Sequence, residues 1–269
     1  MNFLLLIFLL SNIFSVLFPS FCYSSKLDSN NILRKVENNA FGLGEVLEYD
    51  IVYGWITAGK GSFRIMPETI EIEGRACYDV RYEVRSLKSL EWIYKVRDVY
   101  LTKIDTSGIF PWEYEQHIRE GSYRRDVTTK FDQRNNKAFA GKDTFDIKDY
   151  VQDIASAMYY LRTFDFSEYK KGDIISLYNF YKDSTYTLNV KVHSREEIEV
   201  EAGTFKTIRI EPLVQKGGLF KNDGSIIIWL TDDERKLPIL VESKVFIGSI
   251  GVELIKYSGL RGRVDAKIE

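Results

Sequence analysis

The chain of 269 residues has few of the residues that carry covalent cross-links or catalysis: two cysteines, two histidines and five prolines. The first cysteine, Cys22, lies in a segment that we expect to be removed, which leaves only Cys77. A single cysteine excludes an intramolecular disulfide, so the hydrophobic core must hold the folded chain together. The formal net charge of −2 gives no electrostatic reason to expect a nucleic acid partner.

Familiar catalytic motifs are also missing. The sequence contains no Gly-x-Ser-x-Gly elbow, no His-Glu-x-x-His pair and no phosphate-binding loop. His117 alternates with charged residues on one strand face, which is typical of a solvated side chain. His193 precedes Ser194, and neighbouring strand residues point to opposite faces, so these two are not expected to form a catalytic pair. We therefore predict no catalytic residue, no cofactor and no metal site, and a protein that is not an enzyme.

The first 25 residues have no charged side chain and contain two apolar runs followed by small residues. This pattern is typical of a secretory signal peptide, and we expect residues 1–24 to be removed after Ser24. The expected location is therefore the periplasm of an exporting cell. Two alternatives remain: an uncleaved membrane anchor, because the apolar run approaches spanning length, and lipidation at Cys22, which the bulky Phe21 disfavours.

Alternation of apolar and polar residues predicts strands through most of the remaining chain. In "VLEYDIVYGW" and "RACYDVRYEVR" every second residue is apolar, as in a strand with one buried and one solvated face. Tyrosine and phenylalanine, 17 of each, favour such surfaces. Glu73-Gly74 and Asp223-Gly224 separate apolar runs and are typical of tight hairpin turns. We count about a dozen strands by this rule.

One segment, "DYVQDIASAMYYLRTF", has helical spacing instead. Its apolar positions are Val151, Ile154, Ala155, Met158 and Leu161. Asp149, with Gln152 three residues later, resembles a capping box at the start of the helix. The only large surface able to cover this helix is a curved sheet.

The predicted fold is therefore mostly β: a strongly curved antiparallel sheet, or open β-barrel, packed around one mid-chain amphipathic helix. Residues 25–43 are expected to form a polar arm or linker, residues 44–260 a single open-barrel domain and residues 261–269 a polar tail.

Several blocks of the sequence resemble a known family. They are "NNAFGLGEVLEYDIVYGWITAGKGSF", "QDIASAMYYLR", "REEIEVEAGTFKTIRIEPLVQKGGLF" and "IIIWLTDDERKLPILVESKVFIGSI". In this order they are similar to the domain of unknown function 3108, a family of exported bacterial proteins, over roughly residues 40 to 259. The resemblance implies an open barrel similar to that of periplasmic lipoprotein carriers. It implies no activity, because the family has no established catalytic residues.

The acidic cluster in "TDDERKLP" has two interpretations. Asp232, Asp233 and Glu234 lie between two apolar runs, where aspartate side chains can bond the nearby amides of a hairpin turn. A metal site or an acid-assisted hydrolase would need partners from elsewhere in the chain, which a local run cannot supply. We favour the turn. Cys77 falls among mixed charges on a polar strand face, which favours an unpaired, unreactive thiol over an activated one.

Aromatic residues on the faces that we expect to point inward are the candidates for ligand contact. Together with the helix residue Met158 they are Tyr49, Tyr53, Trp55, Tyr78, Tyr82, Trp92, Tyr94, Trp112 and Tyr114. Such rings can line a cavity for an apolar chain, because barrels of this size can enclose a ligand. They can equally fill the interior by close packing.

These observations lead to three functional hypotheses. The first is a non-enzymatic exported protein that binds an apolar or lipid-like molecule in an open barrel. The second is a structural protein of the cell envelope, with a filled barrel and a protein partner at an exposed sheet edge. The third is a hydrolase that uses Asp232, Asp233 or Glu234. The volume and polarity of the space between the helix and the sheet should separate the first two.

Overall fold

The computed structural model describes residues 33–213, 226–244 and 248–268. These residues form one antiparallel 14-stranded sheet, the helix α1 (Ile154–Leu161) and two short 3-10 helices, η1 (Lys88–Leu90) and η2 (Phe166–Glu168). The strands are β1 (Val46–Tyr53), β2 (Ile56–Ile72), β3 (Arg75–Ser86), β4 (Arg97–Asp105), β5 (Pro111–Glu120), β6 (Tyr123–Asp132), β7 (Lys137–Ala140), β8 (Asp143–Asp146), β9 (Ile174–Tyr181), β10 (Ser184–Val200), β11 (Gly203–Leu213), β12 (Ile226–Thr231), β13 (Pro238–Lys244) and β14 (Ser249–Ser258).

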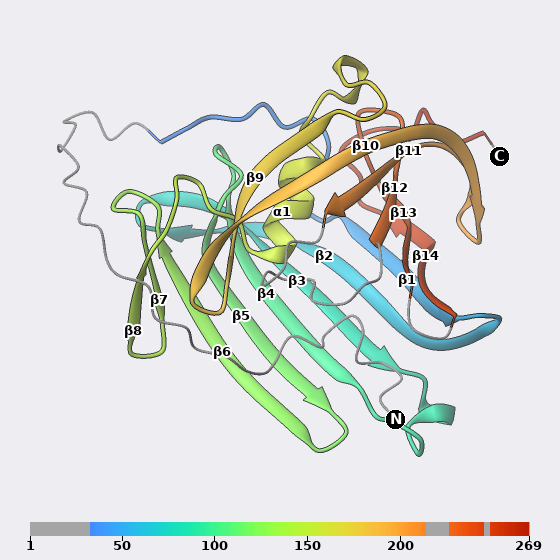
Figure 1. Cartoon of the computed structure of the whole chain (residues 1–269), viewed down its shortest axis with the longest axis horizontal. Coiled ribbons are helices and arrows are strands. Elements are labelled where there is room, and N and C mark those ends of the chain that lie inside the picture. Colours follow the sequence, from blue (N-terminus) through green and yellow to red (C-terminus); the bar gives the residue numbers. More distant parts are fainter. Residues whose placement is uncertain (1–32, 214–225, 245–247, 269) are drawn as a thin grey trace.

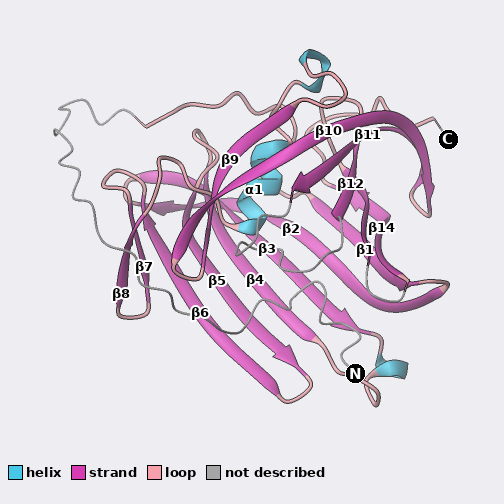
Figure 2. Ribbon diagram, viewed as in Figure 1, coloured by secondary structure: helices cyan, strands magenta, loops and turns pink. Residues whose placement is uncertain are grey.

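The chain passes through the sheet in two halves. Strands β1 to β8 pair in sequence order, β9 to β14 do the same, and β14 pairs with β1. Because β8 and β9 lie at opposite ends of this order, the strongly curved sheet is not closed (Figure 1). Helix α1 is part of the connection between these two end strands and lies inside the curved sheet (Figure 2). The predicted mostly β, open-barrel fold around one helix is confirmed.

The predicted face of β1 and the predicted turn between β2 and β3 agree with this sheet. Leu47, Tyr49 and Ile51 of β1 are buried, as their alternation predicts. Glu73 and Gly74 join β2 to β3 with φ angles of 51° and 72°, the positive values that a tight hairpin turn requires. The predicted signal peptide, residues 1–24, and the predicted turn at residues 223–224 lie outside the described residues.

Helix α1 begins later than the sequence indicates, so the predicted cap at Asp149 is wrong. The backbone of Gln152 pairs with β9, where its N–H donates to Tyr178 and its carbonyl accepts from Phe180. This extended pairing prevents helical conformation before Asp153. The Asp153 side chain caps the helix, accepting from the amides of Ala155 and Ser156. It also accepts a hydrogen bond from the Thr102 hydroxyl at 2.6 Å, which fixes the start of α1 to β4.

The apolar face of α1 packs against the second half of the sheet. Ala157 and Leu161 belong to a buried cluster whose other members come mainly from β9 to β12: Phe166, Ile175, Leu177, Val190, Val192, Ile208, Ile210, Ile228 and Leu230. Of the predicted helical stripe, Ala155 and Leu161 are buried, Val151 is buried just before the helix, Met158 is half-buried and Ile154 is exposed. Burial of such side chains is the main favourable term in folding.

The segments predicted as a polar arm and a polar tail pack against the barrel where they are described. Phe41 is fully buried, and its ring lies edge-on to Tyr159 at 4.8 Å between centroids. At the other end of the chain, the Ala266 amide donates to Asp233, and Lys267 bridges to Phe205 of β11. Both segments therefore extend the core beyond residues 44–260. Within the described ranges, no helix has the length and apolar character needed to cross a membrane.

A buried ion pair joins the end of α1 to the start of the sheet. Arg162, the C-cap of α1, is 2% exposed, and Glu45, just before β1, is 1% exposed. Two guanidinium nitrogens donate to the two carboxylate oxygens at 2.6 and 2.8 Å. The Arg162 Nε also donates to the carbonyl of Arg235 in the β12–β13 turn. This bidentate geometry, with the remaining donor bonded, is what makes a buried pair tolerable.

Glu45→Gln is expected to destabilise the fold strongly, because it leaves the Arg162 charge buried without its counter-charge. Breaking a buried pair in this way costs about 3–5 kcal/mol, and urea unfolding measures the loss. The control Asp146→Asn breaks the exposed pair with Lys137 and is expected to cost less than about 1 kcal/mol. Equal losses in the two variants would contradict this role for Glu45.

Candidate functional site

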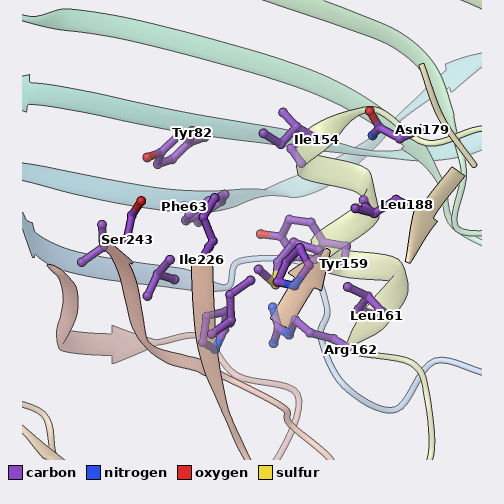
Figure 3. A pocket seen from close by; sticks show the side chains of 18 of the residues that line it. Phe63, Tyr82, Ile154, Tyr159, Leu161, Arg162, Asn179, Leu188, Ile226 and Ser243 are labelled. Carbon is purple, nitrogen blue, oxygen red and sulfur yellow. The ribbon is translucent and has the colours of Figure 1, made fainter. Parts of the chain in front are cut away.

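A cavity of about 240 Å³ lies between α1 and the inner face of the sheet and is partly open to solvent. Figure 3 shows α1 residues Ile154, Tyr159 and Leu161 on one side and Phe63, Tyr82 and Ile226 on the other. The remaining lining residues are Leu47, Tyr49, Tyr100, Ala155, Ala157, Met158, Arg162, Asn179, Tyr186, Thr187, Leu188, Pro212, Leu213, Ile228, Pro238, Val241, Ser243, Ile250 and Val252. The lining is mostly apolar, as in sites for small apolar ligands.

A row of aromatic rings forms the part of the cavity wall built by β2, β3 and β4. Register places Phe63 opposite Tyr82 and Tyr82 opposite Tyr100. The rings stack, with centroids 4.2 Å and 5.6 Å apart. Tyr114 of β5 continues the row at 6.4 Å from Tyr100. Cross-strand aromatic pairs stabilise sheets, so these rings make a firm flat surface that faces the helix.

The cavity lining has no net charge among the described residues. Arg162 is the one charged residue of the described lining, and its ion pair with Glu45, which is not part of the lining, neutralises its charge. The guanidinium also lies 5.3 Å from the Phe41 ring centroid and 5.4 Å from that of Tyr159. Because its charge is already balanced, Arg162 is poorly suited to hold an anionic ligand.

Two polar groups of the lining are buried without a hydrogen-bond partner in the described part of the chain. Asn179 is 3% exposed, and neither its amide nitrogen nor its amide oxygen is bonded. The Tyr159 hydroxyl is likewise unbonded, and burial raises its pKa well above the ordinary value, which keeps it protonated. Buried polar groups are usually paired, so both need an explanation.

A pair of acidic side chains lies beside Tyr100, on the same buried face of the sheet. Asp98 of β4 and Glu120 of β5 are both buried and share a hydrogen bond. The Arg119 amide donates to Asp98 at 2.7 Å. Burial and the neighbouring Asp98 raise the pKa of Glu120 to about 7, because two carboxylates in a dry site cannot both ionise easily.

The sequence profile described as "Protein of unknown function (DUF3108)" matches residues 48–255. The chain belongs to this family. Its fold is similar to that of the β-barrel-like protein of domain of unknown function DUF1849 from Brucella abortus, with a TM-score of 0.52 and 13% identity over 80% of this chain and 97% of that one. A hypothetical protein from Chlamydia trachomatis aligns with a TM-score of 0.37 and 9% identity over 85% and 92% of the two chains. No curated protein matches the chain.

In this DUF3108 protein, the predicted ligand-contact residues are distributed unevenly. Tyr49, Tyr82 and Met158 lie along the cavity, and Tyr114 extends its aromatic row. The other buried or half-buried rings pack into hydrophobic clusters and do not line the cavity: Tyr78, Trp112, Tyr53 and Tyr94. Trp55 and Trp92 are 92% and 83% exposed, so the prediction that they face inward is wrong. Both lie in turns, where strand alternation no longer determines which way a side chain points.

Sequence reasoning missed Arg162, Asn179 and Tyr100 as cavity residues. The partners of Arg162 are far away in sequence, so no local pattern indicates its burial. Asn179 did leave a signal, because it alternates in phase with the buried Ile175 and Leu177 of β9. An asparagine on an otherwise apolar strand face is a candidate functional residue in its own right.

The acidic cluster is a turn, as the sequence favours. It connects the paired strands β12 and β13. Asp233 accepts hydrogen bonds from the Thr231 hydroxyl and from the amides of Arg235, Lys236 and Ala266. Asp232 pairs with Arg195, and Glu234 pairs with Arg235. Among the described residues, no group of three or more His, Cys, Asp or Glu side chains is arranged to hold a metal ion, and the cluster does not line the cavity.

Cys77 is more deeply buried than its polar strand face indicates. Leu33, Phe110 and Trp112 pack around it and cover this part of the sheet. Burial raises the pKa of its thiol to about 12, which is the opposite of an activated nucleophile. His117 contacts Asp126 and Glu115, and His193 contacts Glu211. The contacts with Asp126 and Glu211 are ordinary cross-strand contacts, and Glu115 is a neighbour of His117 on the same strand.

The raised pKa of Glu120 predicts that the free energy of unfolding depends on pH. Its folded pKa of about 7 exceeds the unfolded value of about 4.3, so the folded protein binds more protons between these limits. The contribution is therefore fully present below pH 4.3 and is lost as the pH rises through 7. We compare the effect of Glu120→Gln on the free energy of unfolding at pH 8 and at pH 5. In urea unfolding, this effect is expected to be more favourable at pH 8 by on the order of 1–2 kcal/mol.

The control for this measurement is Glu197→Gln at an exposed position of β10. It should show no comparable difference between pH 5 and pH 8. A gain at pH 8 that is the same in both variants would show that burial beside Asp98 is not the cause.

Proposed function

We propose that this protein is a non-enzymatic, exported binding protein that holds an apolar or lipid-like molecule between α1 and the sheet. The observation that carries the proposal is the mostly apolar cavity of about 240 Å³ at that place. Interiors normally close-pack, so a space of this size over a row of stacked rings favours a ligand site over a filled core. The side chain of Asp233 already accepts hydrogen bonds within the acidic turn, which disfavours the alternative of a hydrolase that uses this turn.

The size of the cavity limits what it can hold. An apolar cavity of about 150 Å³ accommodates benzene, so by the same ratio about ten non-hydrogen atoms fit here. The opening to solvent allows a longer chain to extend outward. A single acyl or alkyl chain suits these dimensions better than a bulky ring system.

Export to the periplasm is part of the proposal and is supported by the sequence alone. The uncharged apolar start followed by small residues favours a cleaved signal, with an N-terminal anchor or a lipidated Cys22 as the alternatives. An envelope partner at a sheet edge is less well supported. Strand β8 is only four residues long, and Gln152 pairs with part of the outer edge of β9.

n-Butylbenzene, an apolar probe with ten carbon atoms, is expected to bind in the cavity and raise the melting temperature. At five times Kd, binding stabilises the folded state by about 1 kcal/mol, which corresponds to about 2–4 °C for a chain of this size. Leu188→Trp places a larger side chain in the cavity and is expected to abolish the shift. Native mass spectrometry of the exported protein should show a co-purifying lipid.

The matched control is Ile174→Trp, the same replacement of an aliphatic residue at an exposed position of β9. It should keep the full response to n-butylbenzene. An unchanged melting temperature in the natural sequence, together with no retained lipid, would refute the proposed function.

A further inference from the structure

The strongest unexplained feature of the cavity is the side chain of Asn179. It is buried, and both atoms of its amide lack a partner in the described ranges. In Figure 3 the Asn179 side chain lies towards Ile154, at the start of α1. A buried amide gives up hydrogen bonds to water, so leaving it unpaired has a cost that a bound polar group would remove.

The backbone holds Asn179 in this position. The alternation of β9 turns it inward with Ile175 and Leu177, and register places it opposite Tyr186 of β10. On the other edge, Gln152 makes backbone hydrogen bonds to Tyr178 and Phe180, the two neighbours of Asn179. The backbone that carries the Asn179 amide is therefore held on both sides before a ligand binds, which lowers the entropy cost of binding.

The charges around the cavity select against ionised head groups. The only lining cation among the described residues, Arg162, is already paired with Glu45. Asp98 and Glu120 lie close to the lining residue Tyr100, so the electrostatic potential there is unfavourable to an anion. A cation would lose its hydration without gaining a direct ion pair, because no acidic side chain belongs to the described lining.

The free groups of Asn179 define the complementary chemistry. Its amide offers N–H donors and a carbonyl acceptor, so it pairs best with a head that both accepts and donates. The Tyr159 hydroxyl adds a second unbonded polar group to the lining. A hydroxyl or carboxamide head satisfies the Asn179 amide, whereas the mostly apolar remainder of the lining suits an apolar chain.

We propose that the ligand is a neutral amphiphile, an apolar chain with an uncharged hydroxyl or amide head, and that Asn179 binds the head. This inference rests on the proposed function of the cavity. The amide of Asn179 then distinguishes such molecules from fatty acid anions and from quaternary ammonium amphiphiles, which have the same chain.

The test compares 1-decanol, decanoate and decyltrimethylammonium with n-butylbenzene at pH 8, using calorimetric titration of the full-length protein. The natural sequence is expected to bind 1-decanol at least ten-fold more tightly than either charged amphiphile. Asn179→Leu is expected to weaken 1-decanol binding five- to ten-fold and to leave n-butylbenzene binding unchanged or tighter. The same variant should melt at an equal or higher temperature without ligand, because it removes an unpaired buried amide.

The matched control is Asn189→Leu on the neighbouring strand β10. Asn189 lies opposite Ser176, and its side-chain oxygen accepts a hydrogen bond from the Ser176 hydroxyl on the exposed side of the sheet. This control is expected to bind all four compounds like the natural sequence. Asn179→Val provides a second variant if Asn179→Leu folds poorly, and the head-group series on the natural sequence needs no variant.

Two results would overturn the neutral-amphiphile proposal while the proposed function stands. One is binding of decanoate or decyltrimethylammonium as tight as that of 1-decanol. The other is an Asn179→Leu variant that binds 1-decanol as tightly as the natural sequence does, or that loses as much affinity for n-butylbenzene as for 1-decanol. Failure of all four compounds to bind would instead refute the proposed function itself.

Discussion

The buried ion pair between Arg162 and Glu45 determines how the two halves of this sheet enclose a space. Helix α1 lies in the connection between the end strands β8 and β9. Arg162 at its C-terminal end is bonded to Glu45 before β1 and to the carbonyl of Arg235 after β12. A single side chain thus joins three segments that are far apart in sequence. A pair buried this deeply is stable only while all its bonds are made, so it fixes one arrangement.

The other end of the helix is fixed in a similar way. Asp153 caps α1 and accepts a hydrogen bond from Thr102 in the middle of β4. With both ends held by polar contacts, α1 cannot move freely towards the sheet to fill the remaining space. The aromatic row of Phe63, Tyr82 and Tyr100 forms a stacked surface opposite it. The cavity therefore follows from the way the helix is held, in addition to the size of the surrounding side chains.

The sequence predicted the sheet and the helix well because both depend on local periodicity. Alternation in β1 and β3 identified Tyr49 and Tyr82, and the acidic turn at Asp233 followed from its composition. Periodicity failed where the chain leaves regular structure, as at Trp55. It also failed where a distant segment covers a surface, as at Cys77, whose polar-looking face lies under Phe110. The position of Arg162 could not be predicted, because its partner lies 117 residues away in the sequence.

The buried polar residues of the interior differ in how completely their side chains are hydrogen-bonded. Arg162, Glu45 and Asp153 are completely or almost completely hidden, and each makes several short hydrogen bonds. Asn179 is hidden to the same degree, yet its amide makes none within the described residues. If stability alone had shaped this position, an apolar residue like its neighbours Ile175 and Leu177 would serve better. Positions that violate local rules without local compensation are expected at functional sites. The unpaired amide is thus the observation that most strongly supports the proposed ligand site between the helix and the sheet.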